Sequence, residues 1–182
     1  MGPFKIGWDT SLRKDRYRRG MYVFWKRTIL YPSLKTFDAP TRAVCTTQRS
    51  NTNTPMQALV ALNDPVFIEG AVALAQRVLC DKHSRTFRNR LSRAFRLVLG
   101  RLPEKAEQDR FHAFYEQQLK HFEQHTKSVA DFVRMANELN QAWNPRSSSS
   151  KKLLKSVSPA EFAAWSMIAS TLLNLDEAIT RE

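Results

Sequence analysis

The sequence predicts an all-α protein: a helical bundle-like domain of five to six helices, preceded by an irregular N-terminal arm rich in basic and aromatic residues. From Thr54 onward, apolar residues recur at the three- and four-residue spacing of amphipathic helices. Helix-start signals precede several of these segments, and only 5 of the 182 residues are glycine. No segment shows the alternation of apolar and polar residues that indicates a strand. We therefore assign the arm and a polar loop to residues 1–53 and the helical domain to residues 54–182.

The N-terminal arm, residues 1–36, is rich in large aromatic side chains, among them Trp8, Tyr17, Tyr22, Phe24, Trp25 and Tyr31. A helical turn or a short strand is expected within residues 18–27. Pro32 is expected to end it, because proline lacks the backbone N–H that both structures use. The arm offers these apolar side chains no obvious partners, so we expect them to pack on the helices that follow or on a segment further upstream.

A short helix is predicted over residues 55–62. Thr54 and Gln57 have the spacing of a capping box, in which each side chain accepts a hydrogen bond from the other residue's backbone N–H. The proline between them fits the first helical position. Asn63 is expected to end this helix at a sharp corner.

The next two helices are predicted over residues 65–80 and 86–99. Asp64 followed by proline repeats the start signal of the preceding helix. Gly100 suits the end of the second of these helices, because glycine readily adopts the left-handed backbone that closes a helix.

The C-terminal part contains three further helical patterns. One begins after Pro103, with two glutamates near the positive end of its dipole, and a weaker one covers residues 129–140. Four consecutive serines and two lysines predict a flexible loop near residues 145–157. The last helix starts with the capping box Ser158–Glu161 and runs to about residue 175. Its expected inward face consists of Phe162, Trp165, Ala169 and Leu172.

The chain is strongly basic, with a net charge of +12. Residues 1–50 contain 11 Lys or Arg and three Asp, a surplus of +8. Such a surplus favours anionic partners, among which we keep anionic polysaccharide open. We expect no nucleic-acid partner, since no nucleic-acid-binding motif or row of base-stacking aromatics is present. No apolar stretch approaches the roughly 20 residues of a membrane span. The N-terminus also lacks the apolar core of a signal peptide.

The first candidate site is a polar loop between two helical patterns. Its members have charged or amide side chains: Asp38, Arg42, Arg49, Asn53, Gln57 and Asp64. One interpretation is a pocket in which two helix N-termini bind an anion. The other is that these residues cap helices and satisfy the loop's backbone. We favour the second, because capping alone explains the residue types.

The second candidate, for anion binding, is a face of the helix predicted over residues 86–99. It consists of Arg85, Arg88, Arg93 and Arg96, with Arg90 and Arg101 nearby. A row of arginines can contact phosphate or sulfate groups. A solvated face or a domain–domain contact explains the same row, and this is the interpretation that we favour.

Metal and thiol chemistry find little support in the sequence. Cys45 and Cys80 lack metal-ligand spacing, and the residues leave open whether they are free or paired. If Cys45 acted as a nucleophile, it would need a nearby base, and no histidine lies in its motif. We therefore expect Cys45 to be a buried structural thiol. His121 and His125 lack a third ligand, so no metal site is predicted. No Cys-x-x-Cys-His occurs, so we expect no haem on this chain.

Several blocks of the sequence form a recognisable pattern: Tyr22–Thr28, Pro32-Ser33, Thr36–Pro40, Cys45, Arg49, Thr52–Pro55, Gln57–Leu59, Leu62–Pro65, Ala94–Pro103, Ala164-Trp165, Leu172–Glu177 and Thr180–Glu182. These blocks resemble one family, the planctomycete cytochrome-associated C-terminal domain of unknown function 1553. Two positions, Gln48 and Asn51, lack the basic residue that is usual nearby, which weakens anion binding by the loop. Cys80 matches no family cysteine, which argues against a bridge to Cys45.

The resemblance implies a domain of uncharacterised function at the C-terminal end of a large exported or periplasmic multidomain protein. The family domain begins upstream of Met1, so we expect this chain to be part of a longer protein. Any haem would belong to a cytochrome c-like domain upstream. The function that we favour is a helical interaction or scaffold domain, bound to upstream domains of the same polypeptide or to a companion protein.

Two alternatives stay open. One is an active site, polysaccharide- or redox-linked, that the upstream domains complete. The other is a basic module that binds anions or nucleic acid. No catalytic motif is evident, and we predict no enzymatic activity for this chain alone.

Overall fold

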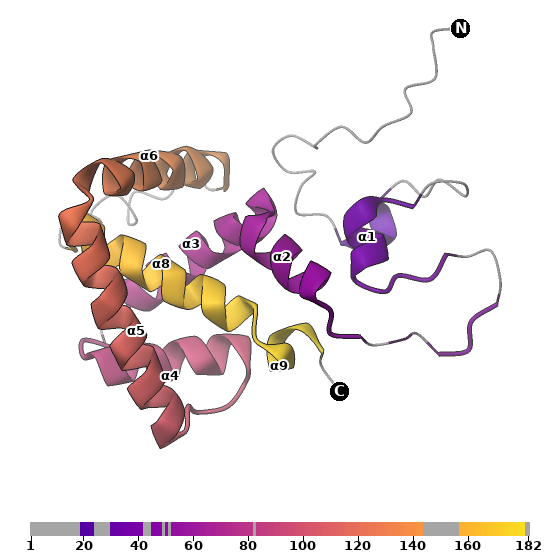
Figure 1. Cartoon of the computed structure of the whole chain (residues 1–182), viewed down its shortest axis with the longest axis horizontal. Helices are drawn as coiled ribbons and strands as arrows, with labels where there is room; N and C mark the ends of the chain where they lie inside the picture. Colours follow the sequence, from indigo (N-terminus) through magenta and orange to yellow (C-terminus); the bar gives the residue numbers. More distant parts are fainter. Residues whose placement is uncertain are drawn as a thin grey trace, which may run out of the picture. The chain divides into compact units, whose positions relative to one another are not determined.

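The computed structural model describes residues 19–23, 30–41, 45–48, 50, 52–81, 83–143 and 157–180. Every regular element in these residues is a helix and none is a strand, which confirms the predicted all-α class (Figure 1). The chain divides into two compact units, residues 1–60 and 61–182, which we describe separately.

The first unit contains the 3-10 turn η2 (Gly20–Tyr22), the short helix α1 (Pro32–Thr36) and the start of α2 (Pro55–Asn63). Gly20 lies close to Leu34 of α1, since a Cβ added at residue 20 would come within 3.1 Å of the leucine Cδ2. The turn expected within residues 18–27 is η2, and residues 24–29 lie outside the described part.

One expectation for this unit was wrong: Pro32 begins α1 and does not end an element. Proline is suited to the first helical turn, because the N–H that it lacks has no intrahelical partner there. The sequence around Pro32 therefore did not show whether a helix ends before this proline or begins at it.

The second unit is a helical domain. Its helices are α3 (Pro65–Leu79), α4 (Phe87–Val98), α5 (Lys105–Gln124), α6 (Thr126–Trp143), α8 (Pro159–Leu173) and α9 (Asp176–Ile179). Helices α3, α4, α5 and α8 lie close to the predicted ranges, and α6 extends beyond 129–140 at both ends. Helix α9 was not predicted. Helix α8 is central and packs against α3, α5, α6 and α4 (Figure 1).

The sequence of α8 explains its central place. Apart from Glu161 it has no charged residue, and small and large apolar side chains surround its axis. A helix that is apolar on all sides is buried on all sides. The buried residues are Phe162, Ala163, Ala164, Trp165, Ser166, Ile168, Ala169 and Leu172, a wider set than the single inward face that we expected.

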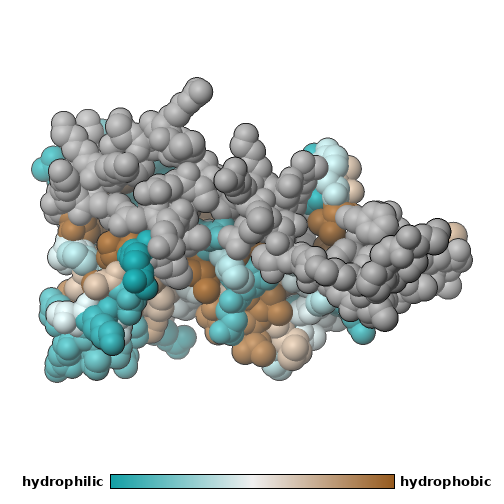
Figure 2. Space-filling model, turned by 90° about the horizontal axis from the view of Figure 1, so that it is seen from above, coloured by the Kyte–Doolittle hydropathy of each residue, from teal (hydrophilic) through white to brown (hydrophobic). Residues whose placement is uncertain are grey.

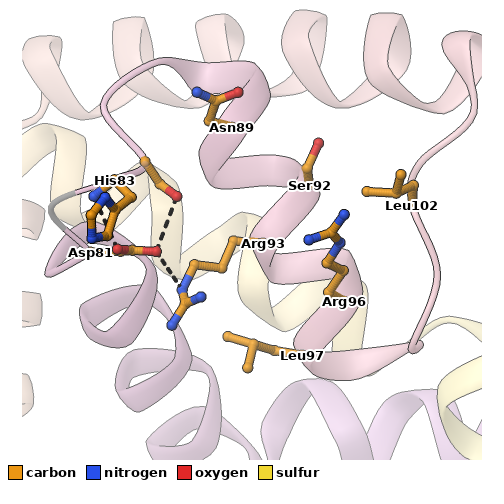
Figure 3. A pocket seen from close by; sticks show the side chains of 9 residues that line it. Asp81, His83, Asn89, Ser92, Arg93, Arg96, Leu97 and Leu102 are labelled. Atoms are coloured by element: carbon orange, nitrogen blue, oxygen red, sulfur yellow. Dashed lines mark hydrogen bonds and ion pairs between the residues drawn. The ribbon is translucent and has the colours of Figure 1, made fainter.

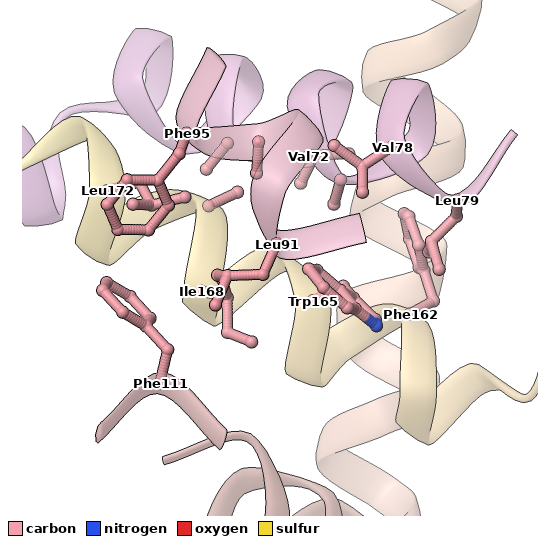
Figure 4. Close-up of a cluster of buried hydrophobic side chains, with 14 residues drawn as sticks. Val72, Val78, Leu79, Leu91, Phe95, Phe111, Phe162, Trp165, Ile168 and Leu172 are labelled. Atoms are coloured by element: carbon pink, nitrogen blue, oxygen red, sulfur yellow. The ribbon is translucent and has the colours of Figure 1, made fainter. Parts of the chain in front are cut away.

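The core of the second unit is built from side chains of α3, α4, α5 and α8 (Figure 4). Leu91 and Phe95 of α4 face Ile168 and Leu172 of α8, and all four are fully buried. The rings of Phe95 and Phe111 meet edge to face, with centroids 5.5 Å apart. Each such residue stabilises the fold by about 1.5–3 kcal/mol through removal of apolar surface from water.

Most predicted helix ends are confirmed. The Asp64 carboxylate accepts from the backbone N–H of Val66 at 2.8 Å, which caps α3. Gly100 follows α4 with φ at +77°, the left-handed conformation expected of it. Ser158 accepts from the backbone N–H of Glu161 at 3.0 Å at the start of α8.

No single helix among the described residues has both the length and the apolar composition needed to cross a membrane. Helices α2 and α3, bent by 65° relative to each other, meet these criteria only as a pair. The bend agrees with the corner predicted at Asn63.

Candidate functional site

Gln57 is the centre of a hydrogen-bonded network in the first unit. Its side chain is only 1 % exposed. Its Oε1 accepts from the backbone N–H of Thr54 at 3.0 Å, and its own backbone N–H donates to Thr54 Oγ1 at 3.3 Å. These two bonds are the predicted capping box. The Gln57 Nε2 also donates to the carbonyl of Thr36 at 2.9 Å, and so joins the start of α2 to the end of α1.

The Asp38 carboxylate is the second part of this network. Its Oδ2 accepts from the backbone N–H and the hydroxyl of Thr52, at 2.9 and 2.6 Å, and from Gln57 Nε2 at 3.3 Å. Asp38 has φ at +56°, a conformation in which aspartate is more common than most other residues. One carboxylate oxygen thus binds three donors and fixes the loop between α1 and α2.

The polar loop therefore matches its structural interpretation where it is described. Asp38 and Gln57 are brought together, and Thr52 is a partner that the sequence analysis missed. Its position two residues before the capping threonine was the available signal. Asn53 is exposed, and Asp64 caps α3 in the second unit. Arg42 and Arg49 lie outside the described residues.

The arginines on α4 do not form a single cluster. Arg93 pairs with Asp81, with Nε 2.7 Å from Oδ2 (Figure 3). The same Asp81 carboxylate accepts from the backbone N–H of His83 and from the Ser84 hydroxyl, both at 3.1 Å. The pKa of Asp81 lies below its usual range, chiefly because of the hydrogen bond from the His83 N–H and to a smaller extent because of the Ser84 hydroxyl and Arg93.

Arg93 and Arg96 line one hollow of about 470 Å³ (Figure 3). We call it the α4 hollow; its lining residues are Asp81, His83, Ser84, Asn89, Ser92, Arg93, Arg96, Leu97 and Leu102. Arg88 lines a different and smaller hollow of about 260 Å³, next to His112 of α5. Arg85 lies before α4 and lines neither of these two hollows.

Arg90 and Arg101, which lie near the predicted row of arginines in the sequence, have structural roles. Arg90 Nη1 pairs with Glu161 Oε1 at 2.5 Å, and this bond joins α4 to the start of α8. Arg101 binds Glu107 at the start of α5 and Glu177 in α9, each at 2.7–3.1 Å. Its bonds to Glu107 hold the pKa of that carboxyl below its usual range.

The remaining candidates are thiols and histidines. Cys45 and Cys80 are both free, and burial raises the pKa of the Cys80 thiol. Cys45 is exposed, so the expectation of a buried thiol was wrong. The rings of His121 and His125 stack with centroids 4.3 Å apart, and His125 Nδ1 lies 2.8 Å from the carbonyl of His121. Within the described ranges, no three His, Cys, Asp or Glu side chains are grouped as metal ligands.

The family to which the chain belongs is shown by comparing its sequence with models of known protein families. Residues 4–115 match the model of the family described as Protein of unknown function (DUF1553). The chain belongs to the DUF1553 family. The DUF1553 match includes the polar loop, α2, α3, α4 and the α4 hollow, and it ends within α5. The resembling blocks in residues 164–182 lie outside it. No curated protein and no solved structure matches the chain.

Proposed function

We propose that this chain is a helical interaction domain that binds another folded protein domain through the outer face of α2. The observation that carries this proposal is a row of exposed apolar side chains on that helix. Met56, Leu59 and Leu62 are 58 %, 54 % and 48 % exposed. We call these three residues the α2 stripe.

The spacing of the α2 stripe supports recognition of a partner. Residues three apart lie on neighbouring positions of a helix surface. The buried residues Gln57 and Ala61 lie on the opposite side of α2. Helices bound in an apolar groove present anchors at this kind of spacing.

The composition of α2 argues against an ordinary solvent-exposed helix. Its nine residues, Pro55–Asn63, include no charged side chain. Helices on the surface of soluble proteins usually present charged or polar residues to water. In the view of Figure 2, the described residues include both hydrophobic and hydrophilic ones. Exposed apolar surface of the α2 kind is a common feature of interaction sites.

The polar network gives the α2 stripe a fixed base. Gln57 is bound on one side to Thr54 and on the other to Thr36, and Asp38 closes the loop. A pre-ordered helix start reduces the entropy lost when the stripe binds a partner. This role also explains why the polar loop residues are engaged with each other.

The charge of the chain limits the partner's chemistry. Residues 1–50 have a surplus of +8, so we propose an apolar groove with an acidic rim. The family resemblance suggests where such a groove belongs. It favours a neighbouring domain in a large exported, planctomycete-type polypeptide with this chain at its C-terminal end, or a companion protein. Any haem would then be bound by a cytochrome c-like neighbour.

A photo-crosslinking amino acid at position 59, introduced into the full-length protein in its source cells, tests this proposal. Peptide mass spectrometry should map the crosslinks to one domain with acidic residues around an apolar groove. The matched control is the same amino acid at Gln117, an exposed residue of α5. Crosslinks that are equally frequent from both positions would contradict the proposal. A crosslink from residue 59 to a second copy of this chain would replace it with self-association.

A further inference from the structure

We propose that the α4 hollow binds a small organic anion, with a carboxylate or phosphate ester group at Arg96 and an apolar body against Leu97 and Leu102. This inference concerns a different surface from the α2 stripe and does not depend on the proposed function. Its volume of about 470 Å³ falls in the usual range of small-molecule sites.

The positive charge of the hollow comes from Arg96. Arg93 is neutralised by Asp81, with 2.7 Å between Nε and Oδ2. Arg96 is exposed, and no acidic side chain in the described part of the chain pairs with it. A guanidinium can bind a carboxylate or a phosphate through two parallel hydrogen bonds. Among the described residues that line the hollow, Arg96 is therefore the arginine available to an incoming anion.

Further donors lie in a row with Arg96 on the same helix. Asn89, Ser92 and Arg96 are separated by three and four residues, which places them on one face of α4. All three side chains surround the hollow (Figure 3). Ser92 and Arg96 are one turn apart, so a hydroxyl and a guanidinium can share the oxygens of one anionic group, and the Asn89 amide lies one turn further along.

Two leucines give the hollow apolar surface. Leu97 comes from the end of α4 and Leu102 from the loop after it (Figure 3). Leu102 is 52 % exposed. Covering it with a ligand's apolar body would remove this surface from water. Inorganic phosphate lacks such a body, so the hollow favours an organic anion.

Both walls of the hollow are held by ion pairs. Asp81 binds Arg93, Ser84 and the backbone of His83, which fixes the loop before α4. Arg101 donates to the carbonyl of Leu102 at 3.2 Å while bound to Glu107, which fixes the loop after α4. A hollow that is fixed before binding loses little entropy when a ligand enters.

Titration of the full chain with four probes, followed by NMR, tests the inference. The probes are benzoate, phenyl phosphate, uncharged benzamide and inorganic phosphate, each at millimolar concentration. Benzoate or phenyl phosphate should shift the amide signals of residues 89–102, and the other two probes should shift them much less. Equal shifts with benzamide would show that charge does not contribute to binding. Equal shifts with inorganic phosphate would show that Leu97 and Leu102 do not contribute. No shift with any probe would overturn the inference.

Three variants locate the site. Arg96→Gln should weaken binding roughly tenfold or more, because it removes a charge-assisted hydrogen bond. Arg88→Gln is the matched control, since Arg88 lies on the same helix but lines the smaller hollow. Leu102→Ala should weaken binding of benzoate and leave the response to inorganic phosphate unchanged. The replaced side chains of Arg96, Arg88 and Leu102 are exposed, so these variants should fold. If Arg88→Gln weakens binding as much as Arg96→Gln, the assignment is wrong.

Discussion

Arg101 and Glu107 are joined by two parallel hydrogen bonds, with Nη2 2.7 Å from Oε1 and Nη1 2.8 Å from Oε2. The same guanidinium binds Glu177 through Nε at 3.0 Å and Nη2 at 2.8 Å. It also lies over the ring of Phe95, 5.4 Å from its centroid. One side chain thereby links α4, the first turn of α5 and α9.

Replacing Arg101 should destabilise the second unit. Arg101→Ala should lower the free energy of unfolding by about 1–2 kcal/mol, a value that allows for the partial exposure of the ion pairs. Arg101→Lys should recover only part of this loss, because an ammonium cannot form the two parallel bonds. Urea unfolding followed by circular dichroism measures both, with Lys120→Ala on exposed α5 surface as the control. A loss no larger than that of Lys120→Ala would show that the network contributes nothing.

The stability of the chain should fall in acid through Glu107. Hydrogen bonds from Arg101 hold the Glu107 pKa below its usual range in the folded state. Its contribution is therefore complete above the unfolded pKa of about 4.3 and is lost as the pH falls through the lower, folded pKa. The stability difference between the wild type and Glu107→Gln should be largest near neutral pH and should shrink below about pH 4.3. A difference that is constant between neutral and acidic pH would contradict this role.

Gly100 offers a test of backbone strain alone. Its φ is +77°, and a Cβ at this position would meet no atom within 4 Å. Gly100→Ala should therefore cost about 1 kcal/mol through the left-handed backbone and not through a clash. Gly100→Asn should cost less, because asparagine tolerates this conformation better. Thermal unfolding of the two variants compares them, and equal losses would mean that the backbone conformation is not the cause.

The Asp38 carboxylate should protect the backbone of the polar loop. Asp38→Ala removes the acceptor for the Thr52 N–H and places alanine at φ +56°, so the Thr52 amide should exchange faster with deuterium. Asp38→Asn retains an acceptor oxygen and tolerates the backbone, so its effect should be smaller. Unchanged exchange in Asp38→Ala, with loss of an activity of the full-length protein, would favour a catalytic role instead.

The two cysteines should differ in reactivity with a disulfide reagent. Cys45 is exposed, whereas burial raises the pKa of Cys80 and lowers its thiolate fraction at a given pH. Both thiols should therefore react with the reagent at mildly alkaline pH, one quickly and one slowly. Cys45→Ser should remove the fast phase and Cys80→Ser the slow one. A titration that finds no thiols until reductant is added would indicate that the cysteines are paired.

The helix ends were the most predictable part of the fold. Thr54, Asp64 and Gly100 act through bonds or backbone angles within a few residues, so their sequence spacing was sufficient. Helix α1 was missed because a proline is compatible with both the end of one element and the start of another. The all-round burial of α8 depends on four neighbouring helices, and the spacing of its apolar residues indicated only one face.

The candidate sites were predictable only in part. Asp38 and Gln57 were correctly grouped, since they flank one loop. The division of the α4 arginines depends on residues far away in the sequence: Arg90 bonds across 71 positions to Glu161, and Arg101 across 76 to Glu177. Local sequence cannot show which of several similar arginines has an acidic partner in the folded chain. Arg96, the arginine proposed to bind an anion in the α4 hollow, could therefore be singled out only from the folded structure.

The central place of α8 has a consequence for biosynthesis. Helices α3, α4 and α5 are complete by residue 124, but the helix that covers their apolar faces begins only at residue 159. At about 5–20 residues per second, a ribosome leaves these faces uncovered for seconds before α8 emerges. During that interval the nascent chain depends on chaperones or on transient packing to avoid aggregation. The second unit can therefore complete its core only after α8 has left the ribosome, and slower translation before residue 159 should lower its yield.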